Sequence, residues 1–200
     1  MPDKIKVEKI ILAGFGGQGI LFLGKLLAQV GMISGKYVSW IPSYGPEMRG
    51  GTANCTVIIS EQPIGSPLVT IPDIVIAMNR PSVSKFNVRI KPGGMLMYNS
   101  SLIERQEFRD DIRLVEIPAS EIADDLGDSR VANMVMAGAY VKLSKILIYE
   151  DVTKNISALI STTKKALTEL NLTAFEKGYN FVKEKRYMFG RYVYSVFKGI

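Results

Sequence analysis

The sequence predicts an α/β protein with a three-layer, doubly wound and mostly parallel sheet of the Rossmann type. Short apolar strands alternate with helical segments up to Ala119, after which helices predominate. A glycine-rich turn, Gly14-Phe15-Gly16-Gly17-Gln18-Gly19, joins the first strand to the first helix. Strands that alternate with helices favour a parallel or mixed sheet with helices on both faces.

Each strand is predicted from a run of apolar or β-branched residues that ends at a glycine, a proline or a polar residue. The runs cover residues 7–13, 36–41, 52–60, 73–78, 94–98 and 112–117. Helices are predicted at 20–34 and 131–145, and Asp151 is expected to cap a further helix. Pro42 is expected to end the second strand, and Pro81 suits the first turn of a helix after the fourth strand.

The chain is predicted to form one domain over residues 1–180, followed by a basic and aromatic C-terminal extension over 181–200. The formal charge of +6 is concentrated near this end, where Lys183, Lys185, Arg186, Arg191 and Lys198 face one acid, Glu184. No nucleic-acid-binding motif accompanies these charges, so we interpret them as a solvated tail or a docking surface for a partner subunit.

Composition excludes several kinds of chemistry. Cys55 is the only cysteine and there is no histidine. The chain therefore cannot form an internal disulfide, ligate its own iron–sulfur cluster or carry a Ser-His-Asp system, and we predict no metal site and no catalytic residue in it. The longest apolar stretch, 20–33, is too short to cross a bilayer, and the N-terminus has no signal-peptide pattern, so we expect a soluble, cytoplasmic protein.

The glycine-rich turn predicts an anion-binding loop. Glycines at 14, 16 and 19 fit the spacing of the dinucleotide fingerprint, and a helix behind such a loop offers unpaired N–H groups. The alternative is a tight strand-to-helix turn of any α/β domain. NAD or NADP is disfavoured because the region after the second strand has no acid before Glu47 and no basic residue before Arg49. A P-loop is excluded because no Gly-Lys-Ser/Thr follows the glycines.

Two further segments are candidates for ligand contact. Glu47 and Arg49 lie among glycines, where they either pair with each other or leave Arg49 to meet a phosphate or carboxylate. Asn79 follows the end of a predicted strand, where open α/β sheets bind ligands. Cys55, within a predicted strand, is interpreted as a small buried hydrophobe.

Four segments together resemble the gamma subunit of 2-oxoacid:ferredoxin oxidoreductases, over about residues 5–180. They are the glycine-rich turn, Tyr44-Gly45-Pro46-Glu47-Met48-Arg49-Gly50-Gly51, Asp73-Ile74-Val75-Ile76-Ala77-Met78-Asn79, and Asn133-Met134-Val135-Met136-Ala137-Gly138-Ala139. The resemblance implies a multi-subunit enzyme that converts a 2-oxoacid and coenzyme A to acyl-CoA, carbon dioxide and a reduced acceptor. It implies that 2-oxoglutarate is the favoured substrate, with pyruvate or a branched-chain 2-oxoacid next.

The resemblance also implies partners and cofactors. Thiamine diphosphate with Mg²⁺ and the iron–sulfur clusters belong to alpha, beta and delta-type companion subunits, and ferredoxin or a similar carrier accepts the electrons. The chain would bind no cofactor alone, contact neither nucleic acid nor membrane, and self-associate as a homodimer when isolated. An indolepyruvate oxidoreductase subunit, a stand-alone nucleotide-binding oxidoreductase and a purely structural scaffold remain alternatives.

The resemblance implies that this chain helps to form the coenzyme A site. The glycine loop would meet a phosphate or the pantetheine segment through backbone N–H groups, and Lys25 or Arg49 would neutralise a phosphate. Lys25 would otherwise be a solvent-facing helix lysine. The predicted binding residues are Gly14, Gly16, Gly17, Gln18, Gly19, Lys25, Arg49 and Asn79.

Overall fold

The computed structural model describes residues 6–43, 52–104, 108–144, 146–159 and 165–184. Six strands form one sheet in the order β2-β3-β1-β4-β5-β6. The strands are β1 (Val7–Phe15), β2 (Tyr37–Ser43), β3 (Thr52–Ser60), β4 (Ile74–Ala77), β5 (Met95–Asn99) and β6 (Arg113–Ile117). The α-helices are α1 (Ile20–Ile33), α2 (Arg80–Phe86), α3 (Ala119–Asp125), α4 (Ala132–Leu143), α5 (Tyr149–Leu159) and α6 (Lys165–Glu184), with short 3₁₀ turns η2 (Asn87–Arg89) and η3 (Ser129–Val131).

The sheet is mixed but mostly parallel, as predicted. β1 pairs with β4, β4 with β5 and β5 with β6 in parallel, whereas β3 lies antiparallel to both β1 and β2. Among the described strands, only β3 runs against the others. After β1 the chain passes through α1 to β2 and β3, which form one edge of the sheet. It then crosses to the other side of β1, where β4, β5 and β6 lie.

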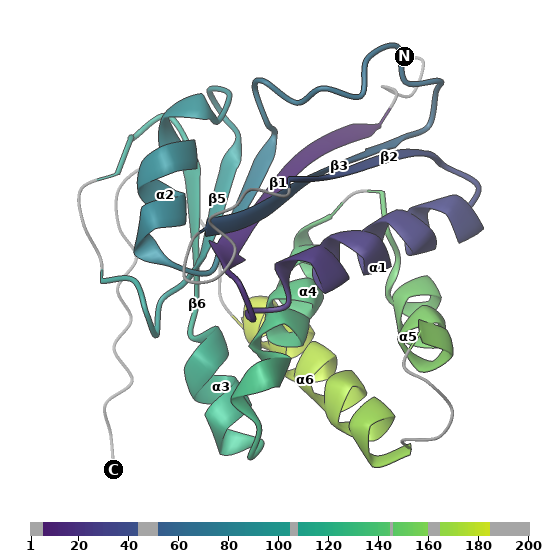
Figure 1. The fold of residues 1–200 in the computed structure, drawn as a ribbon, viewed down its shortest axis with the longest axis vertical. Coiled ribbons are helices and arrows are strands. Elements are labelled where there is room, and N and C mark those ends of the chain that lie inside the picture. The colour runs from purple at the N-terminus through teal and green to yellow at the C-terminus, as the bar shows by residue number, and fades with distance from the viewer. Residues whose placement is uncertain (1–5, 44–51, 105–107, 145, 160–164, 185–200) are drawn as a thin grey trace.

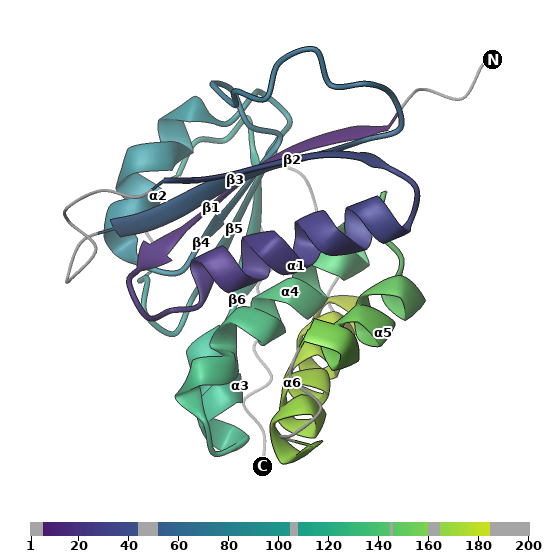
Figure 2. The ribbon, with the colours of Figure 1, turned by 45° about the vertical axis from the view of Figure 1, so that its right-hand side comes forward.

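Helices cover the two faces of the sheet unequally, and the three layers are visible in Figures 1 and 2. Ile10 and Leu12 of β1 face a core shared with α1, α3, α4, α5 and α6, whereas Ile11 and Ala13 face a smaller core under α2. This alternation follows from the two-residue repeat of a strand buried on both sides. The predicted three-layer α/β fold is confirmed.

Two glycines allow α4 and α6 to pack backbone to backbone. A Cβ atom at Gly138 would overlap the carbonyl oxygen of Phe175, and one at Gly178 would overlap the carbonyl oxygen of Val135. Because the two helices approach this closely, the position of α4 is tied to that of α6.

Most predicted element ends differ from the structure by one or two residues, and Pro42 and Asp151 differ for a physical reason. β2 continues through Pro42, which pairs with Cys55; β2 is an edge strand, where the missing N–H of a proline is tolerated. Asp151 does not cap the helix but lies in its first turn, and its carboxylate accepts a hydrogen bond from Ser34 Oγ at 2.6 Å. Helix α6 runs across the boundary predicted between 180 and 181; residues 185–200 of the extension lie outside the described residues.

Candidate functional site

The glycine loop lies at the carboxyl edge of the sheet, between the end of β1 and the start of α1. The chain order reverses here, because α1 leads to β2 on one side of β1 while β4 lies on the other. Figure 2 shows α1 below the sheet and α2 above it at this edge. In open α/β sheets such a reversal point is where ligands bind, outside the carboxyl ends of the strands.

The loop is closed by the side chain of Gln18. Its Oε1 accepts a hydrogen bond from Phe15 N at 2.7 Å, and its Nε2 donates to Met78 O, beyond the end of β4, at 3.4 Å. The backbone completes the turn, since Gln18 N donates to Phe15 O at 3.2 Å. The Gln18 amide therefore braces the loop from within.

The glycines are required for two different reasons. Gly17 and Gly19 have φ of 95° and 71°, in the left-handed region that favours glycine. Gly14 has no room for a side chain, because a Cβ there would lie 2.8 Å from Gln18 Oε1 and 2.9 Å from Ile20 Cγ1. Gly16 is exposed. The loop is therefore compact, and at Gly16 and Gly17 it exposes backbone alone.

The loop presents unpaired donors. In the part of the chain that the structure describes, no group accepts a hydrogen bond from the N–H of Gly16, Gly17 or Gly19. Helix α1 adds the N–H groups of its first turn, which has no side-chain cap and no acidic residue. Unpaired N–H groups and a positive helix end together favour an anionic or carbonyl-bearing ligand.

Asn79 lies beside this loop, directly after Met78, whose carbonyl oxygen contacts Gln18. Asn79 is 3% exposed, and its Oδ1 caps α2 by accepting a hydrogen bond from Ser82 N at 2.9 Å. Its Nδ2 is buried and has no hydrogen-bond partner among the described residues, and neither has Ser82 Oγ. A buried donor without a partner is costly unless a ligand or water satisfies it.

Lys25 is exposed in the second turn of α1, about 8 Å along the helix axis from Ile20. No ion pair involves it within the described residues. Arg49 and Glu47 lie outside the described residues. The structure therefore brings together Gly14, the residues 16–19 and Asn79 and places Lys25 on the helix that follows them.

Cys55 lies under the first turn of α1, where its Sγ donates to Ile20 O at 3.7 Å. Burial raises the pKa of this thiol to about 12, so the reactive thiolate is not populated near neutral pH. Cys55 therefore packs as a small hydrophobe, as predicted.

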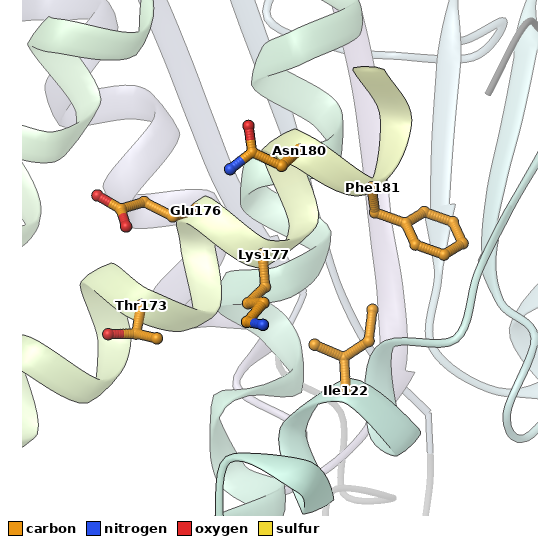
Figure 3. A pocket seen from close by; sticks show the side chains of 6 residues that line it. All are labelled: Ile122, Thr173, Glu176, Lys177, Asn180 and Phe181. Atoms are coloured by element: carbon orange, nitrogen blue, oxygen red, sulfur yellow. The ribbon is translucent and has the colours of Figure 1, made fainter. Parts of the chain in front are cut away.

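A shallow groove of about 420 Å³ lies far along the chain from this loop, between α3 and α6. Figure 3 shows that the side chains of Glu176 and Asn180 point to one side of α6, whereas that of Phe181 points to the other. Of the described residues, Glu176 is the one acid that lines the groove, and it accepts a hydrogen bond from the Tyr149 hydroxyl at 3.0 Å, so the groove has no pair of acids for catalysis. The described residues also contain no group of three His, Cys, Asp or Glu side chains that could hold a metal ion. No helix within them is both long and apolar enough to span a membrane.

Asn133 is a site residue that the sequence predictions omit. It lies in the first turn of α4, is 5% exposed, and its Nδ2 donates to Gly19 O at 3.2 Å. The two residues are 114 positions apart, so no local pattern reveals the contact.

Comparison with known proteins places this geometry in a family. Residues 9–181 match the family described as pyruvate ferredoxin/flavodoxin oxidoreductase. The chain is 36% identical to 2-oxoglutarate synthase subunit KorC of Methanocaldococcus jannaschii, over 90% of this chain and 97% of KorC. It is 35% identical to ketoisovalerate oxidoreductase subunit VorA of Methanothermobacter marburgensis, over 92% of this chain and 39% of VorA. The chain thus spans little more than a third of the length of VorA.

Two solved structures are similar in fold. The gamma subunit of a keto/oxoacid ferredoxin oxidoreductase from Geobacter sulfurreducens superposes with a TM-score of 0.77 at 28% identity, over 89% of this chain and 99% of that one. The 2-oxoglutarate:ferredoxin oxidoreductase of Magnetococcus marinus, solved with 2-oxoglutarate, coenzyme A and succinyl-CoA bound, gives a TM-score of 0.85 at 26% identity, over 92% of this chain and 32% of that one. The chain therefore belongs to the pyruvate ferredoxin/flavodoxin oxidoreductase family, as one of its gamma-type members.

Proposed function

We propose that this chain is the gamma-type subunit of a cytoplasmic, multi-subunit 2-oxoacid:ferredoxin oxidoreductase and that its glycine loop helps to bind coenzyme A. The complex would convert a 2-oxoacid and coenzyme A to acyl-CoA, carbon dioxide and reduced acceptor. The observation that carries the proposal is the set of unpaired N–H groups of Gly16, Gly17 and Gly19 at the sheet reversal. Asn79, whose Nδ2 has no partner among the described residues, directly follows Met78, whose carbonyl oxygen contacts Gln18 of this loop.

Coenzyme A matches these donors chemically. Its phosphates are anionic acceptors and the two amides of its pantetheine arm carry carbonyl oxygens. Backbone N–H groups at a helix N-terminus bind the first kind of group, and a single buried amide donor suits either kind. The described residues of the loop offer no acid that would repel a phosphate.

The redox groups would reside on other chains. Fe–S clusters are held by several cysteines, whereas this sequence contains one cysteine and no histidine. We therefore propose that alpha, beta and delta-type companion subunits carry thiamine diphosphate, Mg²⁺ and the clusters, and that ferredoxin or a similar carrier accepts electrons from them. The gamma-type solved structure and the KorC relative, each matched over nearly its whole length, support a separate subunit of this size.

We propose 2-oxoglutarate as the substrate, supported by the KorC match at 36% identity. The VorA match at 35% makes a branched-chain 2-oxoacid the first alternative substrate, and pyruvate is the second.

An anaerobic affinity purification of this chain from its native cells, followed by mass spectrometry and coenzyme A-dependent assays of each 2-oxoacid, tests both the subunit proposal and the substrate proposal. Co-elution of thiamine and iron–sulfur subunits with activity is expected. A lone chain with bound NAD or FAD would refute the subunit proposal.

The two cationic candidates are tested in the purified complex. Lys25→Ala and Arg49→Ala are each compared with Lys154→Ala, which removes an exposed helix lysine on α5. Loss of a charge-assisted contact should raise the KM for coenzyme A about tenfold or more. A KM for coenzyme A that stays at the Lys154→Ala value in both variants would remove these residues from the site.

A further inference from the structure

We propose that Asn133 is a positioning residue for the coenzyme A site and that, with Gln18, it holds the glycine loop in its donor-presenting shape before the ligand arrives. This inference rests on the proposed function of the loop and adds a residue from a distant helix to it. The amide of Asn133 donates to Gly19 O at 3.2 Å, an oxygen that also accepts the first helical hydrogen bond of α1, from Leu23 N at 2.9 Å.

Gly19 and Asn133 are fitted to each other. Gly19 has a φ of 71° and no side chain, and a Cβ at this position would overlap the amide nitrogen of Asn133. Asn133 is 5% exposed, so its amide cannot turn to water instead. Because Gly19 has no side chain, the Asn133 amide can reach its carbonyl oxygen. This hydrogen bond fixes the position of Gly19, the residue directly before the first residue of α1.

Gln18 supplies the second tether, on the other side of the loop. It connects Phe15 N of β1 with Met78 O at the end of β4. The loop is thus held by three separate parts of the fold, namely β1, the end of β4 and the first turn of α4.

The tethers leave three backbone donors of the loop unpaired. Asn133 uses the carbonyl of Gly19, and Gln18 uses the N–H of Phe15 and the carbonyl of Met78. The N–H groups of Gly16, Gly17 and Gly19 have no acceptor among the described residues. A loop that is held through the carbonyl oxygens of Phe15 and Gly19 and keeps three unpaired donors is preorganised for an acceptor ligand, which lowers the ordering cost of binding.

If the bond between Asn133 and Gly19 only joined α4 to α1, its loss would have a different measurable effect. It would lower the stability of the chain and leave the affinity of the assembled complex for coenzyme A unchanged. Asn171 on α6 provides a matched control, because it is 8% exposed and its Nδ2 donates to a backbone oxygen, Leu167 O, at 2.7 Å. Asn171→Ala removes a similar buried hydrogen bond far along the chain from the loop.

The experiment compares Asn133→Ala and Asn171→Ala in the purified complex. We expect Asn133→Ala to raise the KM for coenzyme A about tenfold, with kcat at saturating coenzyme A and the KM for the 2-oxoacid unchanged. Hydrogen exchange of the bonded amides of Gln18 and Leu23, which close the loop and begin α1, should accelerate in the same variant. Asn171→Ala should lower the melting temperature and change neither the KM for coenzyme A nor exchange in the loop.

Gln18→Ala is the second variant, needed if Asn133→Ala does not assemble. It removes the acceptor for Phe15 N and the donor to Met78 O without adding a charge to the loop, so the KM for coenzyme A should again rise while kcat holds. Unchanged KM values and loop exchange in the Asn133 and Gln18 variants, together with a raised KM in Arg49→Ala or Lys25→Ala, would overturn the positioning role alone. An unchanged KM in all of these variants would overturn the proposed coenzyme A site itself.

Discussion

Asn79 and Asn99 occupy similar places at the carboxyl ends of neighbouring parallel strands, and their side chains are used differently. Both are almost fully buried, and both cap a helix. Asn99 Oδ1 accepts from the N–H groups of Ser101, Ala119 and Ser120 at 3.0–3.3 Å, and its Nδ2 donates to Ser120 Oγ at 2.8 Å. Both polar atoms of its side chain therefore have partners within the fold.

Asn79 uses only its oxygen. Its Oδ1 accepts from Ser82 N, and its Nδ2 has no partner among the described residues. Since a buried amide donor is nearly always satisfied in a folded protein, the unused donor of Asn79 supports the binding role that we propose for it. The comparison teaches that residue type and burial alone do not distinguish these two asparagines, whereas the hydrogen bonds of their side chains do.

Replacement of Asn99 by alanine should give the largest effect. Three N–H groups would lose their acceptor in a buried setting, so we expect the free energy of unfolding to fall by about 3 kcal/mol. Urea unfolding of the full chain measures this change. In the Asn99→Ala complex that still assembles, the KM for coenzyme A should equal that of the wild type. A raised KM would mean that Asn99 and Asn79 do not differ in their effect on coenzyme A binding.

Two replacements of Asn79 should separate its two roles. Asn79→Ala removes both the cap and the free donor, which should lower the free energy of unfolding by about 1 kcal/mol and raise the KM for coenzyme A about tenfold. Asn79→Ser retains an oxygen that can cap α2 but has no amide at the position of Nδ2. It should recover most of the stability and none of the affinity, as urea unfolding and steady-state kinetics would measure. If serine restored the affinity as well, the role of Asn79 would be that of a cap alone.

The sequence was sufficient for the fold because the strands are marked by apolar runs and by clear breakers. Gly14 ends the buried part of β1, and Pro81 stands in the first turn of α2. Pro42 misled the prediction of β2, since a proline ends an inner strand but is compatible with an edge, and strand order is a tertiary property.

The candidate site was predictable only in part. The glycine spacing identified the loop, and Asn79 stood out by its place after a strand. The brace formed by Gln18 and the contact of Asn133 with Gly19 depend on side-chain directions and on segments distant in sequence. The local sequence pattern predicts the backbone conformation of the loop. Which of its buried donors find a hydrogen-bond partner depends on how α4 and the end of β4 pack against the loop.

A third cap, Asp128, should give the smallest effect and extends the comparison to the surface. Its carboxylate accepts from Arg130 N at 3.0 Å and from the Arg130 guanidinium at 2.6 Å, just before α4. The guanidinium, followed by the backbone N–H, lowers the pKa of Asp128 from 3.8 to about 2. Because the folded pKa lies below the unfolded one, the carboxylate stabilises the fold above its ordinary pKa, and this contribution is lost as the pH falls from 3.8 toward 2.

Asp128→Asn keeps a capping oxygen and abolishes this titration. The urea midpoint of the variant should therefore lie slightly below that of the wild type at pH 7, and the difference should shrink as the pH approaches 3. A difference that is constant from pH 7 to pH 3 would mean that the carboxylate charge adds nothing to the cap. The Asp128 side chain is 17% exposed and its partner Arg130 is largely exposed, so water can satisfy polar atoms that the exchange leaves unpaired. Replacement of Asp128 should therefore lower the free energy of unfolding much less than replacement of Asn99. The loss of stability at Asn99, Asn79 and Asp128 should follow the number of buried polar atoms with which each side chain forms hydrogen bonds.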